Sequence, residues 1–288
     1  MKEPSLGRKY AKELCDGGLV TVDGRRAFKS LPLASGATVS FPERAPKQAI
    51  ANAQLALDIR FESEHCVVVH KVAGQPTAPL DGLELETLAN ALVARFPEMH
   101  GVGNNPLEPG LIHRLDNSTS GLLVAAKSQC AFDVLKRALA AGAIEKEYIA
   151  VVLDGNLPES GSVDAPLAPS PHNTRKVDVV RPGSRSARPA VTSFQVVARG
   201  YGLAIARVLA KRALRHQIRA HFASLGCPLA NDEIYGGARF EALSPGRHAL
   251  HAVRVAWAGA EAIAGFDVSA PLPLDLQTWL NDLGLIFP

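Results

Sequence analysis

The sequence predicts an α+β protein whose central sheet is mixed and mostly antiparallel, with flanking helices. Strand and helix patterns are interspersed along the 288 residues, without the regular strand–helix–strand alternation of a parallel α/β fold. The clearest strand, residues 146–153, is a largely apolar run that stops at the turn dipeptide Asp154-Gly155. The sequence also contains no repeat of fixed period and no phosphate-binding glycine motif. These observations favour one mixed sheet over a repeat protein or a nucleotide-binding fold.

Residues 1–44 are predicted to form a small basic α/β unit. Residues 5–18 have the spacing of a short helix that ends at Gly17-Gly18. The alternating segment 19–22 predicts a strand that closes at the Asp23-Gly24 turn, and residues 38–41 predict another strand. From the charge pattern alone, we interpret this unit as an extension with solvated lysines.

Residues 45–288 are predicted to form a second, larger domain after a linker-like stretch at 43–54. Its first half is predicted to contain strands at 66–70 and 121–126 and helices at 84–96 and 129–141. Ser128 is the expected N-cap of the second helix, because a serine oxygen there accepts a hydrogen bond from a first-turn amide.

The second half of this domain is predicted to be richer in strands. After 146–153, the Pro-, Ser- and Arg-rich segment 156–190 is expected to be loop with a short hairpin. The remaining predictions are strands at 191–198, 203–209, 249–257 and 265–269, and helices at 212–225 and 274–284.

Composition and cysteine spacing limit the class of protein. The four cysteines show no C-x-x-C pair, which argues against a zinc site and favours a reducing compartment over a disulfide framework. No apolar run approaches the roughly 18 residues needed to cross a bilayer, and the N-terminus has no signal-like apolar core. We therefore expect a cytoplasmic protein. The net charge of +3 permits an acidic partner such as RNA without requiring one.

The polar segment 113–121, His-Arg-Leu-Asp-Asn-Ser-Thr-Ser-Gly, leads directly into the predicted strand 121–126. It places Asp116 at the edge of a sheet, two residues after Arg114. A carboxylate in such a place can act as a nucleophile or a base, and the small residues after it allow close approach of a large ligand. The alternative is an aspartate that caps a turn through local hydrogen bonds.

The predicted helix 212–225 has an apolar stripe and a basic stripe. Leu214, Ile218, Phe222 and Leu225 recur at helical spacing, and Arg212, Arg215, His216 and Arg219 gather on the other side. A solvated basic face is one interpretation. The other is that Arg219 lies near Asp116 and holds that carboxylate ionised and oriented.

Three blocks in order resemble one family. They are His113-Arg114-Leu115-Asp116 with Thr119-Ser120-Gly121, then Lys146-Glu147-Tyr148, then His216-Gln217-Ile218-Arg219-Ala220-His221 followed by Asp232-Glu233-Ile234-Tyr235-Gly236. Their order and spacing resemble the RluA-type pseudouridine synthases, which isomerise uridine in ribosomal or transfer RNA. The resemblance covers about residues 56–285. The N-terminal unit is similar to the latter part of the small RNA-binding module often fused to these enzymes, without that module's first helix.

The resemblance implies roles for eight residues. Asp116 would be the catalytic carboxylate, Tyr148 would lie against the target base, and Arg219 would pair with Asp116. Arg114 would enter the space left by a flipped-out nucleotide. The remaining implied substrate-binding residues are His113, Thr119, His216 and Gln217, of which the two histidines are expected to orient loops. No cofactor and no metal is expected, since the isomerisation has no redox step. The expected partner is RNA, with no membrane contact, and we expect a monomer.

Two other functions remain compatible with the sequence. The first is an RNA-binding protein of the same fold that lacks turnover, because Ala213 and Leu214 stand where the family usually has Gly-Arg. The second is a carboxylate-using nucleosidase acting on free nucleosides, which the basic helix and N-terminal unit disfavour. Incubation with RNA separates these from an RNA pseudouridine synthase.

Overall fold

The computed structural model describes residues 8–41, 48–81, 83–212, 214–260 and 263–285. The chain divides into two compact units, Met1–Pro46 and Lys47–Pro288. Each is described by itself below. The predicted boundary at 44/45 and residues 43–47 of the predicted linker lie outside the described residues.

The N-terminal unit is a helix packed on a three-stranded antiparallel sheet. Helix α1 (Arg8–Asp16) precedes strands β1 (Thr21–Val22), β2 (Arg25–Arg26) and β3 (Val39–Ser40), which lie in the order β2-β1-β3. Asp23 and Gly24 both have positive φ, as the two-residue turn of a hairpin requires. Leu14, Val20 and Ala27 are the buried residues of its small core.

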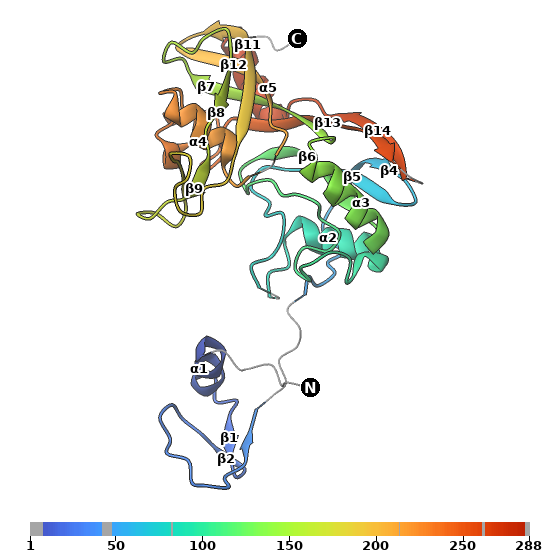
Figure 1. Ribbon diagram of the computed structural model, residues 1–288, viewed down its shortest axis with the longest axis vertical. Helices are drawn as coiled ribbons and strands as arrows, with labels where there is room; N and C mark the ends of the chain where they lie inside the picture. The colour runs from blue at the N-terminus through green and yellow to red at the C-terminus, as the bar shows by residue number, and fades with distance from the viewer. Residues whose placement is uncertain (1–7, 42–47, 82, 213, 261–262, 286–288) are drawn as a thin grey trace. The chain divides into compact units, whose positions relative to one another are not determined.

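The larger unit is built on a nine-stranded sheet within the described residues, in the order β4-β5-β6-β13-β7-β12-β11-β8, with β14 paired to β13 (Figure 1). The bounds of these strands are β4 Asp58–Glu62, β5 Cys66–Lys71, β6 Ser120–Ala126, β7 Glu145–Leu153, β8 Ser160–Asp164, β11 Val191–Gly200, β12 Leu203–Leu209, β13 Leu250–Ala260 and β14 Ile263–Ser269. Strands β9 (Leu167–Pro169) and β10 (Val177–Val179) form a separate antiparallel pair. The predicted mixed, mostly antiparallel α+β fold is confirmed.

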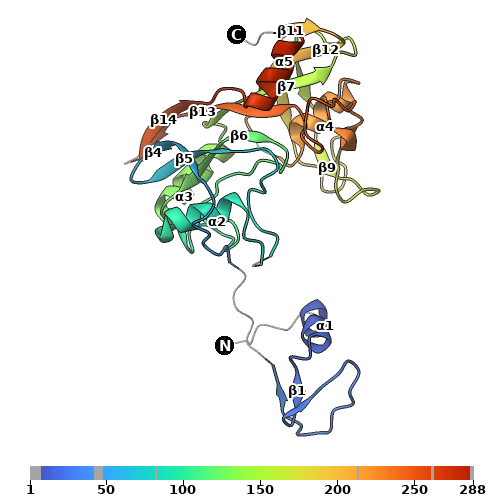
Figure 2. The same cartoon turned by 180° about the vertical axis from the view of Figure 1, so that it is seen from behind.

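Helices cover both faces of this sheet, which explains why its central strands are almost wholly apolar. Helices α2 (Leu88–Arg95) and α4 (Gln217–Ser224) pack on one face, against side chains such as Val69 and Leu123. Helix α3 (Gln129–Ala140) packs on the other face against Val68 and Val124, and α5 (Leu274–Asp282) packs there farther along the sheet, on β7 and β12 (Figure 2). Two short 3₁₀ turns complete the unit, Pro97–Met99 and Glu233–Tyr235.

Among the described strand pairs, β6 and β13 alone run parallel, with Ser120 opposite His251 and Gly121 opposite Ala252. Gly121 has a φ of 120°, and a Cβ there would lie 2.3 Å from the carbonyl oxygen of Ala252. A side chain at this position would push the strands apart, so glycine is required. The pairing brings the loop before β6 next to the residues that precede β13.

Most predicted elements are present, and four differ, among them the helix predicted at 212–225. The helix predicted at 84–96 begins at Leu88, because Thr87 and Asn90 form a capping box. Strand β4 was not predicted, and β8, in the segment expected to be loop and hairpin, joins the main sheet as an edge strand. Ser128 caps α3 as expected, accepting from the Ala131 amide.

The prediction of a helix over 212–225 is wrong in its first third. Helix α4 begins at Gln217, and its N-cap His216 has left-handed backbone angles, φ 54° and ψ 17°. Arg212 and Arg215 therefore do not share a helical face with Arg219, and residue 213 lies outside the described residues. Helical spacing in a sequence cannot detect such a break, because a single left-handed residue leaves the apolar spacing unchanged.

Candidate active site

Asp116 lies in the loop that leads into β6, at the wall of a cleft with a volume of about 1180 Å³. The Asp116 side chain is 23% exposed to solvent. The loop is fixed behind it: the Thr77 hydroxyl donates to the Leu115 carbonyl at 2.7 Å, and the Thr119 hydroxyl lies 2.7 Å from Nε2 of His248. The carboxylate is therefore accessible to a ligand while its backbone is held by buried hydrogen bonds.

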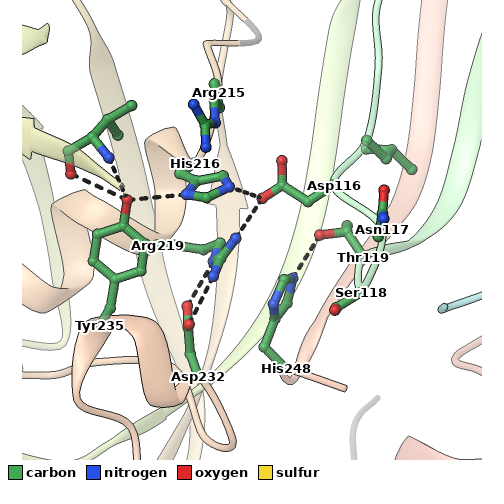
Figure 3. Close-up of polar contacts among 12 residues, drawn as sticks. Asp116, Asn117, Ser118, Thr119, Arg215, His216, Arg219, Asp232, Tyr235 and His248 are labelled. Carbon is green, nitrogen blue, oxygen red and sulfur yellow. Dashed lines mark hydrogen bonds and ion pairs between the residues drawn. The ribbon is translucent and has the colours of Figure 1, made fainter. Parts of the chain in front are cut away.

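Arg219 joins this carboxylate to a second one. Its Nε and Nη2 atoms donate to the two oxygens of Asp232 at 2.7 and 2.8 Å, and its Nη1 donates to Oδ2 of Asp116 at 2.9 Å (Figure 3). Burial alone would lower the pKa of Arg219, but the hydrogen bonds and charges of Asp232 and Asp116 raise it above its ordinary value. A bidentate pair fixes the plane of the guanidinium, so the third bond orients Asp116.

Tyr148 lies on strand β7, on the same side of the sheet as the Asp116–Arg219 pair. It is buried and lines, with Asp116 and Arg219, a small cavity beside the main cleft. Burial raises the pKa of Tyr148, and the charge of Asp116 raises it further. The phenol is therefore protonated at neutral pH and can donate a hydrogen bond to a ligand in this cavity.

His216 completes the group around Asp116. Its Nε2 lies 3.7 Å from Oδ2 of Asp116, and its Nδ1 lies 3.1 Å from the hydroxyl of Tyr235. Burial lowers the pKa of His216 to about 4, so the imidazole is neutral at pH 7.

The other predicted site residues lie in different surroundings. Arg114 is exposed at the cleft and pairs with Glu108 at 2.8 Å. Thr119 is buried behind the loop. The Gln217 amide donates to the Val191 carbonyl and to Thr192, so its hydrogen-bonding groups serve the fold. His113 is buried and accepts from the Val124 amide at 3.3 Å, and burial lowers its pKa to about 3.

Three residues of this region were not identified as functional from the sequence: Asp232, Tyr235 and Arg247. The first two belong to a motif that carried the family resemblance, which was the available signal. Arg247 is buried and donates to the Ser118 carbonyl and to Ser120 Oγ, both at 3.0 Å, and it pairs with Asp275 of α5 at 2.9 Å. It thereby ties the Asp116 loop to the C-terminal helix, which no local pattern indicates.

The cleft is lined by more cations than anions. Arg175, Arg188 and Arg212 are exposed on its wall and form no ion pair with the described residues, and Arg215 donates to the Thr174 carbonyl. Lys136 also lines it. Exposed guanidinium groups around an open cleft suit a polyanion.

The described residues contain no group of three or more His, Cys, Asp or Glu side chains placed to hold a metal ion. In the same part of the chain, none of the helices has the length and apolar character needed to span a bilayer.

Comparison with known proteins identifies the family. Residues 65–224 match the sequence profile of the RNA pseudouridylate synthase family. An uncharacterized RNA pseudouridine synthase of Chloroflexus aurantiacus is 34% identical over 282 residues, which cover 97% of this chain and 86% of that relative. The chain belongs to the RNA pseudouridylate synthase family. It is therefore an isomerase, an RNA pseudouridine synthase, as the sequence resemblance predicted.

Two further relatives extend the match. The ribosomal large subunit pseudouridine synthase D of Zymomonas mobilis is 34% identical over 230 residues, 77% of this chain and 71% of that protein. The solved structure of human RNA pseudouridylate synthase domain containing 4 has a TM-score of 0.62 at 23% identity, covering 80% of this chain and 94% of that one. At that identity, the structural match shows the shared fold.

Proposed function

We propose that this pseudouridine synthase isomerises specific uridines in ribosomal or transfer RNA, with Asp116 as its catalytic carboxylate. The observation that carries the proposal is the contact of Asp116 with Arg219 beside the buried Tyr148. Relatives named for the large ribosomal subunit make its RNA the first substrate to test.

The reaction needs a carboxylate at the sugar. The bond between N1 of uracil and C1′ of ribose breaks, a bond between C5 and C1′ forms, and the hydrogen on C5 is replaced by one on N1. No atom is gained or lost overall. Asp116 either attacks C1′ or removes a sugar proton, and in both roles it must be ionised and aimed, as the Arg219 hydrogen bond favours.

Tyr148 and Arg114 have complementary proposed roles. Tyr148 lines the cavity beside Asp116, where the detached base would be retained, and its phenol helps move the proton from C5 by accepting it on oxygen as the phenol's own proton passes to N1. Arg114 is exposed at the cleft, where it can fill the gap left by an everted nucleotide. Eversion costs a few kcal/mol, which phosphate and stacking contacts must offset.

The exposed arginines of the cleft wall are proposed to bind RNA phosphates. Arg175, Arg188 and Arg212 are solvent-accessible and have no carboxylate to compete with a phosphate among the described residues. The N-terminal unit, with Arg25 and Arg26 exposed on β2, is proposed as an additional RNA contact. We propose that the enzyme acts without a cofactor, as a monomer and in the cytoplasm.

The test is to incubate unmodified ribosomal and transfer RNA with the protein and map new pseudouridines. We expect product with the wild type and with Asp133→Asn, an exposed control on α3, and none with Asp116→Asn. RNA binding without product from the wild type would indicate a protein that keeps the fold without turnover. Release of free uracil would indicate a nucleosidase. Either result contradicts the proposal.

A further inference from the structure

His216 is held in an unusual position beside Asp116. Its φ of 54° lies in the left-handed region, which is unfavourable for a residue with a Cβ and is retained where surrounding contacts fix it. The imidazole packs edge-on against the ring of Tyr235, with ring centres 5.7 Å apart. The backbone strain and the ring packing together keep one edge of the imidazole turned toward the cleft.

The Tyr235 hydroxyl fixes which imidazole nitrogen carries the proton. It accepts a hydrogen bond from the Val177 amide at 3.0 Å and donates its single hydrogen to the Val177 carbonyl at 3.1 Å. Because the Val177 carbonyl can only accept, we assign the hydroxyl hydrogen to it, and with this assignment the remaining contact, with Nδ1 of His216 at 3.1 Å, is donated by the histidine. In a neutral imidazole this leaves the lone pair on Nε2.

Burial keeps the His216 ring neutral. Burial contributes most to lowering the pKa of His216, and Arg219 and Arg215 lower it further, whereas Asp116 and Asp232 act in the opposite direction. The result, about 4, leaves Nε2 an acceptor at neutral pH.

Two hydrogen-bond acceptors thus face each other at the cleft: Nε2 of His216 and Oδ2 of Asp116, 3.7 Å apart (Figure 3). Arg219 donates to Asp116, but no described residue donates to Nε2 of His216. Because Nε2 of His216 lacks a donor, this pair of acceptors suits a ligand whose hydroxyl group can donate a hydrogen bond to it.

The chemistry of an RNA chain leaves one candidate hydroxyl. Within the chain, the 3′ and 5′ oxygens of ribose are esterified, so the 2′-hydroxyl is the free one, on the carbon next to C1′. If Asp116 acts at C1′, as proposed above, an acceptor 3.7 Å from its carboxylate oxygen is within reach of that hydroxyl. We propose that His216, held by Tyr235 with its proton on Nδ1, accepts a hydrogen bond from the 2′-hydroxyl of the target nucleotide and so selects RNA over DNA.

The test combines a change in the protein with a change in the substrate. Two synthetic strands carry the mapped target site, one with uridine and one with 2′-deoxyuridine at the target alone. His216→Asn is the key variant, because asparagine tolerates left-handed angles and its amide can still donate to Tyr235, while it lacks an atom at the Nε2 position. kcat/KM and the dissociation constant are measured for both strands.

The wild type is expected to prefer the uridine strand by about tenfold in kcat/KM, equivalent to ~1.4 kcal/mol and typical of one hydrogen bond. In His216→Asn this preference should fall to about twofold or less, because the group that reads the hydroxyl is gone. An unchanged preference in the variant overturns the proposal, even if its overall rate is reduced. Absence of product from the wild type on both strands overturns the proposed function as well.

Two more variants guard against misinterpretation. Tyr235→Phe removes the hydroxyl that fixes the tautomer, and we expect it to lose part of the preference for the uridine strand. His100→Asn, at an exposed histidine after the turn Pro97–Met99, should keep the wild-type preference. Full retention of the preference in Tyr235→Phe contradicts the proposed tautomer, and loss of the preference in His100→Asn contradicts its assignment to His216.

Discussion

The interior of the cleft and its outer wall use the same side chain in opposite ways. Arg219 is 4% exposed, and its guanidinium is bonded to two carboxylates. Arg175, Arg188 and Arg212 are exposed and unpaired with any described carboxylate. A buried, paired guanidinium fixes geometry, whereas an exposed one contributes attraction that salt screens. We therefore expect changes at the buried ion pair to affect stability and turnover, and changes at the exposed wall to affect RNA affinity.

The largest effect is expected for Arg219→Ala. Removing one partner of a buried ion pair leaves Asp232 buried without its cation, which costs roughly 3–5 kcal/mol of the free energy of unfolding. Urea denaturation measures this loss. Arg188→Ala on the cleft wall is the matched control and should change the free energy of unfolding by less than about 0.5 kcal/mol. Equal losses of unfolding free energy in the two variants would contradict the description of Arg219 as buried and paired and Arg188 as exposed and unpaired.

Asp232→Asn is expected to reduce turnover by about 10- to 100-fold, because the orientation of Arg219, and through it of Asp116, loses a charge-assisted pair. The asparagine keeps the shape of the side chain. Single-turnover rates and RNA dissociation constants should separate, with the rate reduced and the affinity within about twofold of wild type. A loss confined to affinity would contradict a positioning role.

Acid should destabilise the protein through buried histidines. Burial lowers the pKa of His113 and of His251 to about 3, below the value near 6.5 in the unfolded chain. Between these values the unfolded state binds more protons, so the contribution to stability is complete above pH 6.5 and is lost as the pH falls. Each residue accounts for at most about 2 kcal/mol at pH 5. Urea denaturation at pH 7, 6 and 5 measures the slope, and a flat profile over this range would be inconsistent with neutral buried imidazoles.

The smallest effect is expected for the cleft wall. Arg175→Gln combined with Arg188→Gln should weaken RNA binding several-fold at low salt, with little change in single-turnover rate at saturating RNA. Each RNA phosphate that the variant no longer neutralises should reduce the slope of log affinity against log salt by roughly 0.7 to 0.9. Titrations at several salt concentrations measure the slope. A wild-type slope in the double variant would show that these residues do not bind phosphates.

The sequence by itself determined the elements whose signals are local. The apolar run before Asp154-Gly155 specified the strand that carries Tyr148, and Ser128 specified the start of α3. The loop around Asp116 was identifiable because a polar segment rich in small residues runs directly into a strand. The sequence also shows a glycine, Gly121, where the loop meets the strand. It does not show why glycine is needed there, which is the close approach of the Ala252 backbone.

Only the tertiary structure decided how these parts meet. Asp232 and Arg219 are 13 residues apart, and Asp116 is 103 residues from Arg219, so their shared ion pair depends on how the sheet is ordered. The left-handed residue His216 broke a helix that its spacing predicted, because its hydrogen bond and ring packing with Tyr235 outweigh helical propensity there. Strand β8 was missed for a similar reason: an exposed edge strand has little apolar alternation, and its pairing with β11 defines it. Local patterns record what a segment prefers, whereas burial and pairing depend on neighbours that the segment does not contain.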